Sequence, residues 1–385
     1  MALDIDTAMF EKTMRHPCYS GNCTNGRIHL PVAPACNISC NYCNRKFDCV
    51  NESRPGVASE VLSPAAAAAK YRRVKEALPG LTVVGIAGPG DALANFSATE
   101  KTLRLIREFD KDVIFCLSTN GLLLERYAER IKELGVTHVT VTINTVNPKI
   151  GARIYKEVNY GGQRWRGIPG AELLLEKQLA GLIALRKLGL VAKINSVLIR
   201  GLNDEDVLNV ARIAKEYGVY IGNIMQLIPA PGSAFEHMPL TSNQELNEVR
   251  RLAGAHVTQM FHCQQCRADA IGQLGQDLSA AFREEAPGAA DADADAPPRG
   301  SFTVLVTSRD RQVINQHFGH SEEFYIYRYE DGAIRLTEIR NVRKYCGGAD
   351  DCGEYDRTAG MLKAAGGCDF VLTMRIGQAP RQMLE

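Results

Sequence analysis

The segment RIHLPVAPACNISCNYC (residues 27–43) combines an apolar strand pattern with three cysteines that follow it at once. Cys36, Cys40 and Cys43 are separated by three residues and then by two. A zinc ribbon uses two Cys-x-x-Cys pairs and a bacterial ferredoxin uses two-residue gaps, so the spacing fits neither pattern. Three thiolates from one loop would instead leave one iron of a 4Fe–4S cluster open to a small chelating molecule.

The bulk composition is that of an ordinary globular protein. The 385 residues are enough for two domains, and 45% of them are hydrophobic and 23% charged. With 45 basic and 44 acidic side chains the net charge is +1, which favours neither a nucleic-acid nor a membrane partner. No apolar run approaches the ~18–20 residues of a membrane span, and the N-terminus lacks a secretory signal pattern, so we expect a cytoplasmic protein. In that reducing compartment, 12 cysteines favour metal binding or redox chemistry over disulfides.

Six β-rich segments alternate with helical patterns between residues 27 and 228. Strict alternation of this kind predicts a parallel sheet with helices outside it. Six units favour an α/β fold of the partial (β/α)6 TIM-type barrel, with chemistry at the C-terminal strand ends, over a doubly wound open sheet. The strands are expected at 27–33, 81–88, 112–119, 138–145, 191–199 and 220–228.

Residues 271–300 change the character of the chain. The run REEAPGAADADADAPPRG is rich in Ala, Asp, Pro and Gly and has no periodic apolar residues, which predicts a flexible acidic linker. The linker would separate a body, residues 1–270, from a small α/β tail domain, residues 301–385. In the tail we expect strands at 301–308, 322–330, 334–342 and 368–376, with a helix at 357–367.

The spacing Cys-x-x-x-Cys-x-x-Cys, with Tyr42 before the last cysteine, resembles the signature of the radical SAM enzymes. The resemblance implies that the open iron binds the methionyl amine and carboxylate of S-adenosylmethionine (SAM). Reductive cleavage of the sulfonium bond would then give a 5′-deoxyadenosyl radical, so Cys36, Cys40 and Cys43 are candidate catalytic residues.

Polar or glycine-rich residues follow the later strands, where a barrel of this type has its active site. GIAGPGD (85–91) ends the second strand, and in radical SAM enzymes a glycine-rich motif at this position contacts the SAM amine. Taken alone, the same residues would be a simple turn. With Tyr42, the expected SAM-binding residues are Gly88, Gly90, Asp91, Ser118, Asn120, Asn144, Asn195 and Met225.

More cysteines are present in the body than one cluster needs. HCQQC (262–266) is polar and favours ligation by Cys263 and Cys266, whereas Cys116, inside an apolar strand, is when taken alone better explained as a small buried side chain. The others are Cys18, Cys23 and Cys49.

The segments HPCYS (16–20), HLPVAPACNISCNYCNRKFDCVNESRPGV (29–57) and GPGDALAN (88–95) resemble more narrowly the radical SAM enzymes of nitrogenase cofactor biosynthesis. The resemblance implies that two further 4Fe–4S clusters are substrates, fused with an added sulfur and a SAM-derived carbon into an eight-iron carbide precursor. His29, Cys49 and Cys116 would hold one substrate cluster, and Cys18, Cys263 and Cys266 the other. The role of Cys23 stays open.

The implied chemistry uses SAM twice, as a methyl donor and as the source of the radical. Glu52 and Arg54, just beyond Cys49, would orient SAM or assist proton removal, although a solvated loop ion pair is an equally good explanation. The expected partners are cluster-donor and cofactor-carrier or scaffold proteins of nitrogenase assembly.

The tail resembles the NifX-like family of nitrogenase cofactor-binding domains, which implies a ribonuclease H-like fold that holds product or docks a partner. The sequence stops within a helical pattern at RQMLE, so we expect this domain to continue. Two other functions remain open at this stage: another radical SAM maturase with auxiliary clusters, and a non-catalytic iron–sulfur scaffold.

Overall fold

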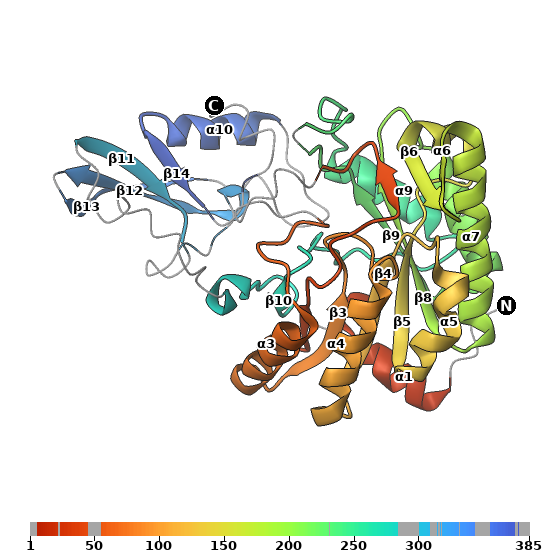
Figure 1. Cartoon of the computed structure of the whole chain (residues 1–385). Coiled ribbons are helices and arrows are strands. Elements are labelled where there is room, and N and C mark those ends of the chain that lie inside the picture. The colour runs from red at the N-terminus through yellow and green to blue at the C-terminus, as the bar shows by residue number, and fades with distance from the viewer. Residues whose placement is uncertain are drawn as a thin grey trace. The chain divides into compact units, whose positions relative to one another are not determined.

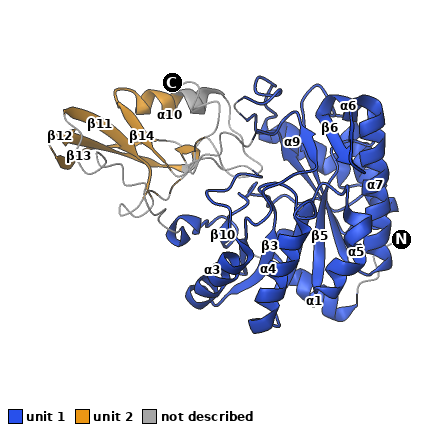
Figure 2. Cartoon of the chain, viewed as in Figure 1, with its two compact units in different colours: residues 1–284 blue, residues 285–385 orange. Residues whose placement is uncertain are grey.

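The computed structural model describes residues 6–21, 24–44, 55–230, 232–283, 300–308, 314, 316, 318–330, 332–342, 355–373 and 376. The chain divides into two compact units, residues 1–284 and residues 285–385 (Figure 2). In the described part, no helix is long and apolar enough to cross a membrane.

The first unit is built on a curled seven-stranded sheet (Figure 1). Six of its strands run parallel in the order β1-β3-β4-β5-β8-β9, and the short β10 pairs antiparallel with β1 at one edge. This order confirms the predicted partial barrel. The strands are β1 (Gly26–His29), β3 (Leu81–Ile86), β4 (Ile114–Thr119), β5 (Val136–Thr142), β8 (Val191–Leu198), β9 (Ile221–Gln226) and β10 (Ile271–Gly272).

Helices pack on the outer side of this sheet and bury its apolar residues (Figure 1). Ser63 caps the first of them through the Ala66 amide, and Pro64 occupies the first turn. A helix that we did not predict begins at Ser242, whose side chain forms a capping box with Glu245. The helices are α3 (Pro64–Ala77), α4 (Phe96–Phe109), α5 (Leu124–Glu133), α6 (Pro148–Ile154), α7 (Gly167–Lys187), α8 (Asp206–Glu216) and α9 (Asn243–Ala253).

The inner side of the sheet is unusually polar. Side chains alternate between the two faces of a strand, so every second residue of a barrel strand points inward. The intervening residues, such as Ile28, Val84, Val139 and Ile194, belong to the apolar core under the helices. The inward positions carry Arg27 and His29 (β1), Val83 and Gly85 (β3), Cys116 and Ser118 (β4), Thr140 (β5), Lys193 and Asn195 (β8), and Asn223 and Met225 (β9).

One segment after α9 spans the opening between the two edges of the barrel. Gln259 forms a bridge to Gly222 of β9, and Ile271 of β10 pairs with Ile28 of β1. Ile271 is fully buried, and a 3-10 turn, η1 (Ser279–Phe282), follows within the same unit. The predicted linker therefore began too early, because residues 271–283 are part of the barrel unit, while 284–299 lie outside the described residues.

Two further pieces complete the first unit. Helices α1 (Thr7–Met14) and α2 (Pro17–Ser20) precede the barrel. A separate antiparallel sheet has the order β2-β6-β7, with β2 (Ile38–Cys40), β6 (Tyr155–Tyr160) and β7 (Gln163–Trp165). The cysteine-rich stretch therefore contains a short strand, where we had expected only a loop.

The second unit is a four-stranded sheet with one helix, close to the predicted pattern. Its strand order is β13-β12-β11-β14, in which only the β11–β14 pair is parallel. Leu305, Phe318 and Phe324 form the centre of its small core. The elements are β11 (Ser301–Val306), β12 (Glu323–Glu330), β13 (Ala333–Asn341), α10 (Tyr355–Ala365) and β14 (Phe370–Leu372), with the 3-10 turn η2 (Phe318–His320).

Candidate active site

The cysteine triplet lies on and beside β2. Cys36 and Cys40 are half-buried against the apolar cluster around Ile38 and Tyr155, and Cys43 is exposed. The amide of Cys43 donates to the Cys40 carbonyl at 3.1 Å, which curls the chain back after the strand. Among the described residues no three Cys, His, Asp or Glu side chains converge on one point as a single metal ion requires. A four-iron cluster suits the triplet better, because each thiolate binds a different iron.

The ends of β4 and β5 hold this cysteine loop in place. Asn120, just beyond β4, directs its Nδ2 to the Cys36 sulfur at 3.8 Å and donates to Asn37 Oδ1 at 2.6 Å. Asn144, beyond β5, donates to the Tyr42 hydroxyl at 3.0 Å. Three of the predicted SAM-binding residues, Tyr42, Asn120 and Asn144, are therefore brought together around the cysteines.

The glycine-rich turn after β3 is tied to the same region. Gly88 has a φ of 135°, a conformation that a side chain disfavours, and the Gly90 amide donates to Ala33 at 2.6 Å. The Asp91 carboxylate accepts from the Asn120 amide at 2.6 Å and from the Thr119 hydroxyl at 2.9 Å. Burial raises the pKa of Asp91, and these hydrogen bonds oppose the rise. Asp91 thus fixes the β3 turn to the end of β4.

A single cavity inside the barrel collects every described residue that we predicted as a substrate-cluster ligand. Ser118, Asn195 and Met225 also line it. The predicted residues Cys49, Glu52 and Arg54, and the open case Cys23, lie outside the described residues. The ligand candidates on the cavity wall are Cys18, His29, Cys116, Cys263 and Cys266.

His29 is arranged as a neutral ligand. Its Nδ1 lies 2.8 Å from the Arg267 carbonyl, which accepts only, so Nδ1 carries the proton and Nε2 keeps its lone pair. Burial, reinforced by the neighbouring Arg27 charge, lowers the pKa of His29 to about 4. Gly85 on the adjacent strand leaves room for the ring, because a Cβ there would lie 2.9 Å from His29 Cδ2.

The sulfurs of Cys263 and Cys266 are surrounded by hydrogen-bond donors. Cys263 accepts from Asn223 Nδ2 at 3.3 Å and from the Gln265 amide at 3.4 Å. Gln265 adopts a φ of 47°, which turns its amide back toward the sulfur. Arg27 donates to Cys266 at 2.8 Å. Donors of this kind stabilise thiolate, the form that binds iron.

Cys18 and Cys116 reach the cavity from different parts of the barrel unit. Both pack, with Cys263, against a cluster that includes Tyr19 and Met260. Burial raises the pKa of the Cys116 thiol to about 12, so in the metal-free protein it keeps its proton, which iron would displace.

The two ends of the barrel unit meet at this cavity. A Cβ on Gly21, next to α2, would lie 3.2 Å from the His262 ring, so the N-terminal helices contact the HCQQC segment. This juxtaposition is what the proposed ligand set of Cys18 with Cys263 and Cys266 requires.

Comparison with known proteins places this geometry in a family. Residues 30–214 match the radical SAM superfamily model and residues 301–385 match the dinitrogenase iron-molybdenum cofactor model. The FeMo cofactor biosynthesis protein NifB of Klebsiella pneumoniae is 45% identical, over 97% of this chain and 86% of the relative. NifB of Frankia alni is 40% identical, over 99% and 85%. The chain belongs to the NifB family.

As a radical SAM protein, this NifB-family chain uses a 4Fe–4S cluster and SAM. The residues of the cysteine loop fit such a cluster, since its three sulfurs are half-buried or exposed and the Asn120 Nδ2 lies 3.8 Å from the Cys36 sulfur. The residues of the cavity likewise fit a bound group made of metal and sulfur, because the neutral His29 imidazole and four cysteine sulfurs line its wall.

Several cavity residues escaped the sequence-based prediction. They are Arg27, Lys193 and Asn223 on the strands and Gln265 in HCQQC. Their signal was available, because Arg27 and Lys193 are charged residues at alternate positions of apolar strands, which places them inside the barrel.

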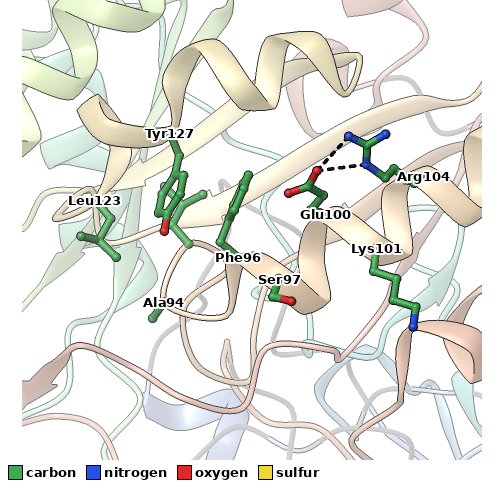
Figure 3. Close-up of a pocket in the computed structure, with 9 residues that line it drawn as sticks. Ala94, Phe96, Ser97, Glu100, Lys101, Arg104, Leu123 and Tyr127 are labelled. Carbon is green, nitrogen blue, oxygen red and sulfur yellow. Dashed lines mark hydrogen bonds and ion pairs between the residues drawn. The ribbon is translucent and has the colours of Figure 1, made fainter.

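A second hollow lies on the outer surface between α4 and α5 and has a different character (Figure 3). Phe96 stacks on Tyr127 at 4.0 Å between ring centroids, and Glu100 pairs with Arg104 beside them. It contains no cysteine or histidine, so it offers no soft metal ligand.

Proposed function

We propose that this chain is a cytoplasmic radical SAM enzyme of FeMo-cofactor biosynthesis that fuses two 4Fe–4S substrates into an eight-iron carbide precursor. The observation that supports it best is the single cavity in which Cys18, His29, Cys116, Cys263 and Cys266 meet. A radical SAM enzyme with one cluster has no use for a second, larger set of soft ligands inside its barrel.

The cysteine loop takes the resident cluster in this proposal. Cys36, Cys40 and Cys43 hold three irons, and the fourth iron receives SAM. When bound, the cluster and SAM supply one-electron cleavage of the sulfonium bond. Tyr42, Asn120 and Asn144 shape the SAM site through the hydrogen bonds they make beside Cys36.

The remaining residues at the strand ends also belong to the proposed SAM site. Gly88 and Gly90 have no side chains, so their backbone can approach the amino-acid part of SAM, and Asp91 holds their turn in place. Ser118, Asn195 and Met225 face the cavity, where SAM and substrate have to meet. Glu52 and Arg54 complete the proposal as residues that orient SAM or accept a proton.

The cavity takes the substrates. His29, Cys49 and Cys116 hold one four-iron cluster, and Cys18, Cys263 and Cys266 hold the other. A neutral imidazole binds iron less firmly than a thiolate does, which suits a cluster that has to leave. SAM supplies the carbon from its methyl group, and the protein contributes proximity.

The cavity and the cysteine loop share their supports. Ser118 lines the cavity, and Asn120, two residues further along the same strand end, contacts Cys36. Ala87 lines the cavity, and the next residue, Gly88, bonds through its carbonyl to Ala33, which leads into the loop. A radical formed at the loop therefore arises next to the wall that holds the substrates.

The second unit matches a cofactor-binding family, and we assign it product holding or docking of cluster-donor and cofactor-carrier proteins of nitrogenase assembly.

The test is anaerobic reconstitution followed by reduction in the presence of SAM. Three four-iron clusters predict about 12 irons per chain, and both S-adenosylhomocysteine and 5′-deoxyadenosine as products. About four irons would contradict the substrate-cluster assignment, and absence of S-adenosylhomocysteine would contradict the carbide chemistry. A scaffold without activity would leave SAM intact. Cys49→Ala should lose iron and product, and retention of both would remove Cys49 from the ligand set.

A further inference from the structure

Lys193 is a buried cation with no acidic side chain among the described residues that line its cavity. It lies on β8 between Thr140 and Ile221 of the neighbouring strands, faces the cavity and is 6% exposed. Its ammonium lies 5.0 Å from the Tyr19 ring centroid. Within the described ranges Lys193 forms no ion pair, and no described Asp or Glu lines the cavity. By contrast Lys70, which is the other lysine of the described residues buried to this degree, pairs with Glu60.

A second cation, Arg27, enters the same cavity but is held differently. It is 2% exposed and donates to the carbonyls of Gly272 at 2.6 Å and Gln273 at 3.0 Å, as well as to Cys266. Asp277 acts on Arg27 electrostatically, but its carboxylate accepts hydrogen bonds from other backbone amides. The cavity is thus positive, and Lys193 is the cation with the fewer partners.

A buried charge without a partner is unfavourable, so its retention needs an anion that is present when the protein works. The soft ligands around Lys193 select metal bound to sulfur. A four-iron cluster with thiolate ligands carries net negative charge, as does the eight-iron product. The cysteine and histidine ligands of the cavity and the positive charge of Lys193 therefore both favour an anionic iron–sulfur cluster.

We infer that Lys193 is the built-in counter-charge of the iron–sulfur substrates, a positioning residue that retains anionic clusters in the cavity without binding iron. The inference rests on the proposed function, since it names what the proposed substrates meet on the wall. The charge of Lys193 acts on two of the proposed ligands. It opposes the rise that burial causes in the pKa of Cys116, and it contributes to the lowering of the pKa of His29.

The inference predicts opposite effects of one substitution on the empty and the loaded protein. Lys193→Met removes an unpaired buried charge, so the iron-free chain should unfold at the same or a higher urea concentration. The reconstituted chain should lose its cavity iron to a ferrous chelator about tenfold faster, the size expected for one unit charge at cluster distance in a protein interior. The midpoint potential of the cavity clusters should become more negative.

Two variants provide the controls in the same full-length, reconstituted protein. Lys193→Arg keeps the charge and should release iron within about twofold of the unsubstituted protein. Lys101→Met, on the exposed side of α4, changes the net charge equally and should leave iron release and potential unchanged.

The outcomes separate this inference from the function on which it rests. If the unsubstituted chain holds only about four irons, the proposed function fails. If it holds about 12 and Lys193→Met releases iron at the same rate as Lys193→Arg, the inference alone is overturned. A lower urea midpoint for iron-free Lys193→Met would also overturn it, because Lys193 would then be a structural residue with a partner of its own.

Discussion

The cysteine loop and the barrel cavity both gather soft ligands, but they do so by opposite routes. The loop takes Cys36, Cys40 and Cys43 from eight consecutive residues, and donors from two strand ends hold it through Cys36 and Tyr42. The cavity takes its ligands from both ends of the unit and from the strands between, and among its described lining residues Lys193 has no acidic partner. The loop is suited to a cluster that stays bound, whereas the positive charge of the cavity is neutralised only when an anionic substrate binds.

The largest effect is expected from Cys40→Ala, which tests whether the loop and the cavity are independent sites. Because the loop alone generates the radical, we expect 5′-deoxyadenosine formation to be abolished while about eight of about 12 irons remain. Iron analysis and chromatography of the SAM products measure both. Cys368→Ala, which removes a half-buried cysteine of the second unit, is the control and should change neither. Loss of all iron from Cys40→Ala would mean that the two sites are not independent.

Cys263→Ala should produce the reverse pattern. It removes the sulfur that accepts hydrogen bonds from Asn223 and Gln265, so about four irons should be lost. The loop is untouched, so SAM should still be cleaved to 5′-deoxyadenosine, now without product formation. A variant that keeps its full iron content would remove Cys263 from the ligand set.

The barrel interior also predicts a pH dependence of the unfolding free energy. Burial lowers the pKa of His138, which lies on β5 with its Nε2 3.1 Å from the Thr13 hydroxyl, to about 3. In the unfolded chain its pKa is about 6.5, so the unfolded state takes up the proton first as the pH falls. Between pH 6.5 and pH 5 this one residue therefore removes up to ~2 kcal/mol of stability.

The measurement is urea unfolding of the iron-free protein at pH 7 and pH 5. His138→Gln should reduce the loss of stability between the two values by up to ~2 kcal/mol, while His237→Gln, at an exposed position, should not. An unchanged pH slope in His138→Gln would show that the ring is protonated in the folded protein.

The smallest effect is expected beside the loop. Tyr42→Phe keeps the ring but removes the hydroxyl that accepts from Asn144, at a cost of ~1 kcal/mol in unfolding free energy. Iron content should stay unchanged, because the hydroxyl binds no metal. A loss of cavity iron in this variant would show that the loop supports the cavity more closely than the comparison assumes.

The sequence was sufficient for the barrel because its strands are long and separated by strong helical patterns. It was not sufficient for β2, β7 and β10, which have only two or three residues each and exist through their tertiary pairing. Helix α9 was missed although the Ser242–Glu245 capping signal was present. The linker boundary was misplaced because Ile271 is buried by pairing with β1, which composition cannot reveal.

For the site, spacing alone identified the cysteine triplet. No spacing rule joins Cys18 to Cys263, and those assignments came from resemblance. The sequence showed that Lys193 is a charged residue at an inward position of an apolar strand. The role that we infer for it depends on the absence of an acidic side chain among its described neighbours, which only the structure reveals.

Helix α2 and the HCQQC segment meet at one cavity, so the binding of a cluster there should change the stability of the protein. A cluster bound by Cys18 and Cys263 would act as a reversible staple between the beginning and the end of the barrel unit. Chain connection of this kind removes entropy from the unfolded ensemble, as a disulfide across a long loop does. The resistance of the protein to heat or to a protease would then rise when the cluster binds and fall when the cluster is released. Cluster occupancy could therefore be followed without measuring iron.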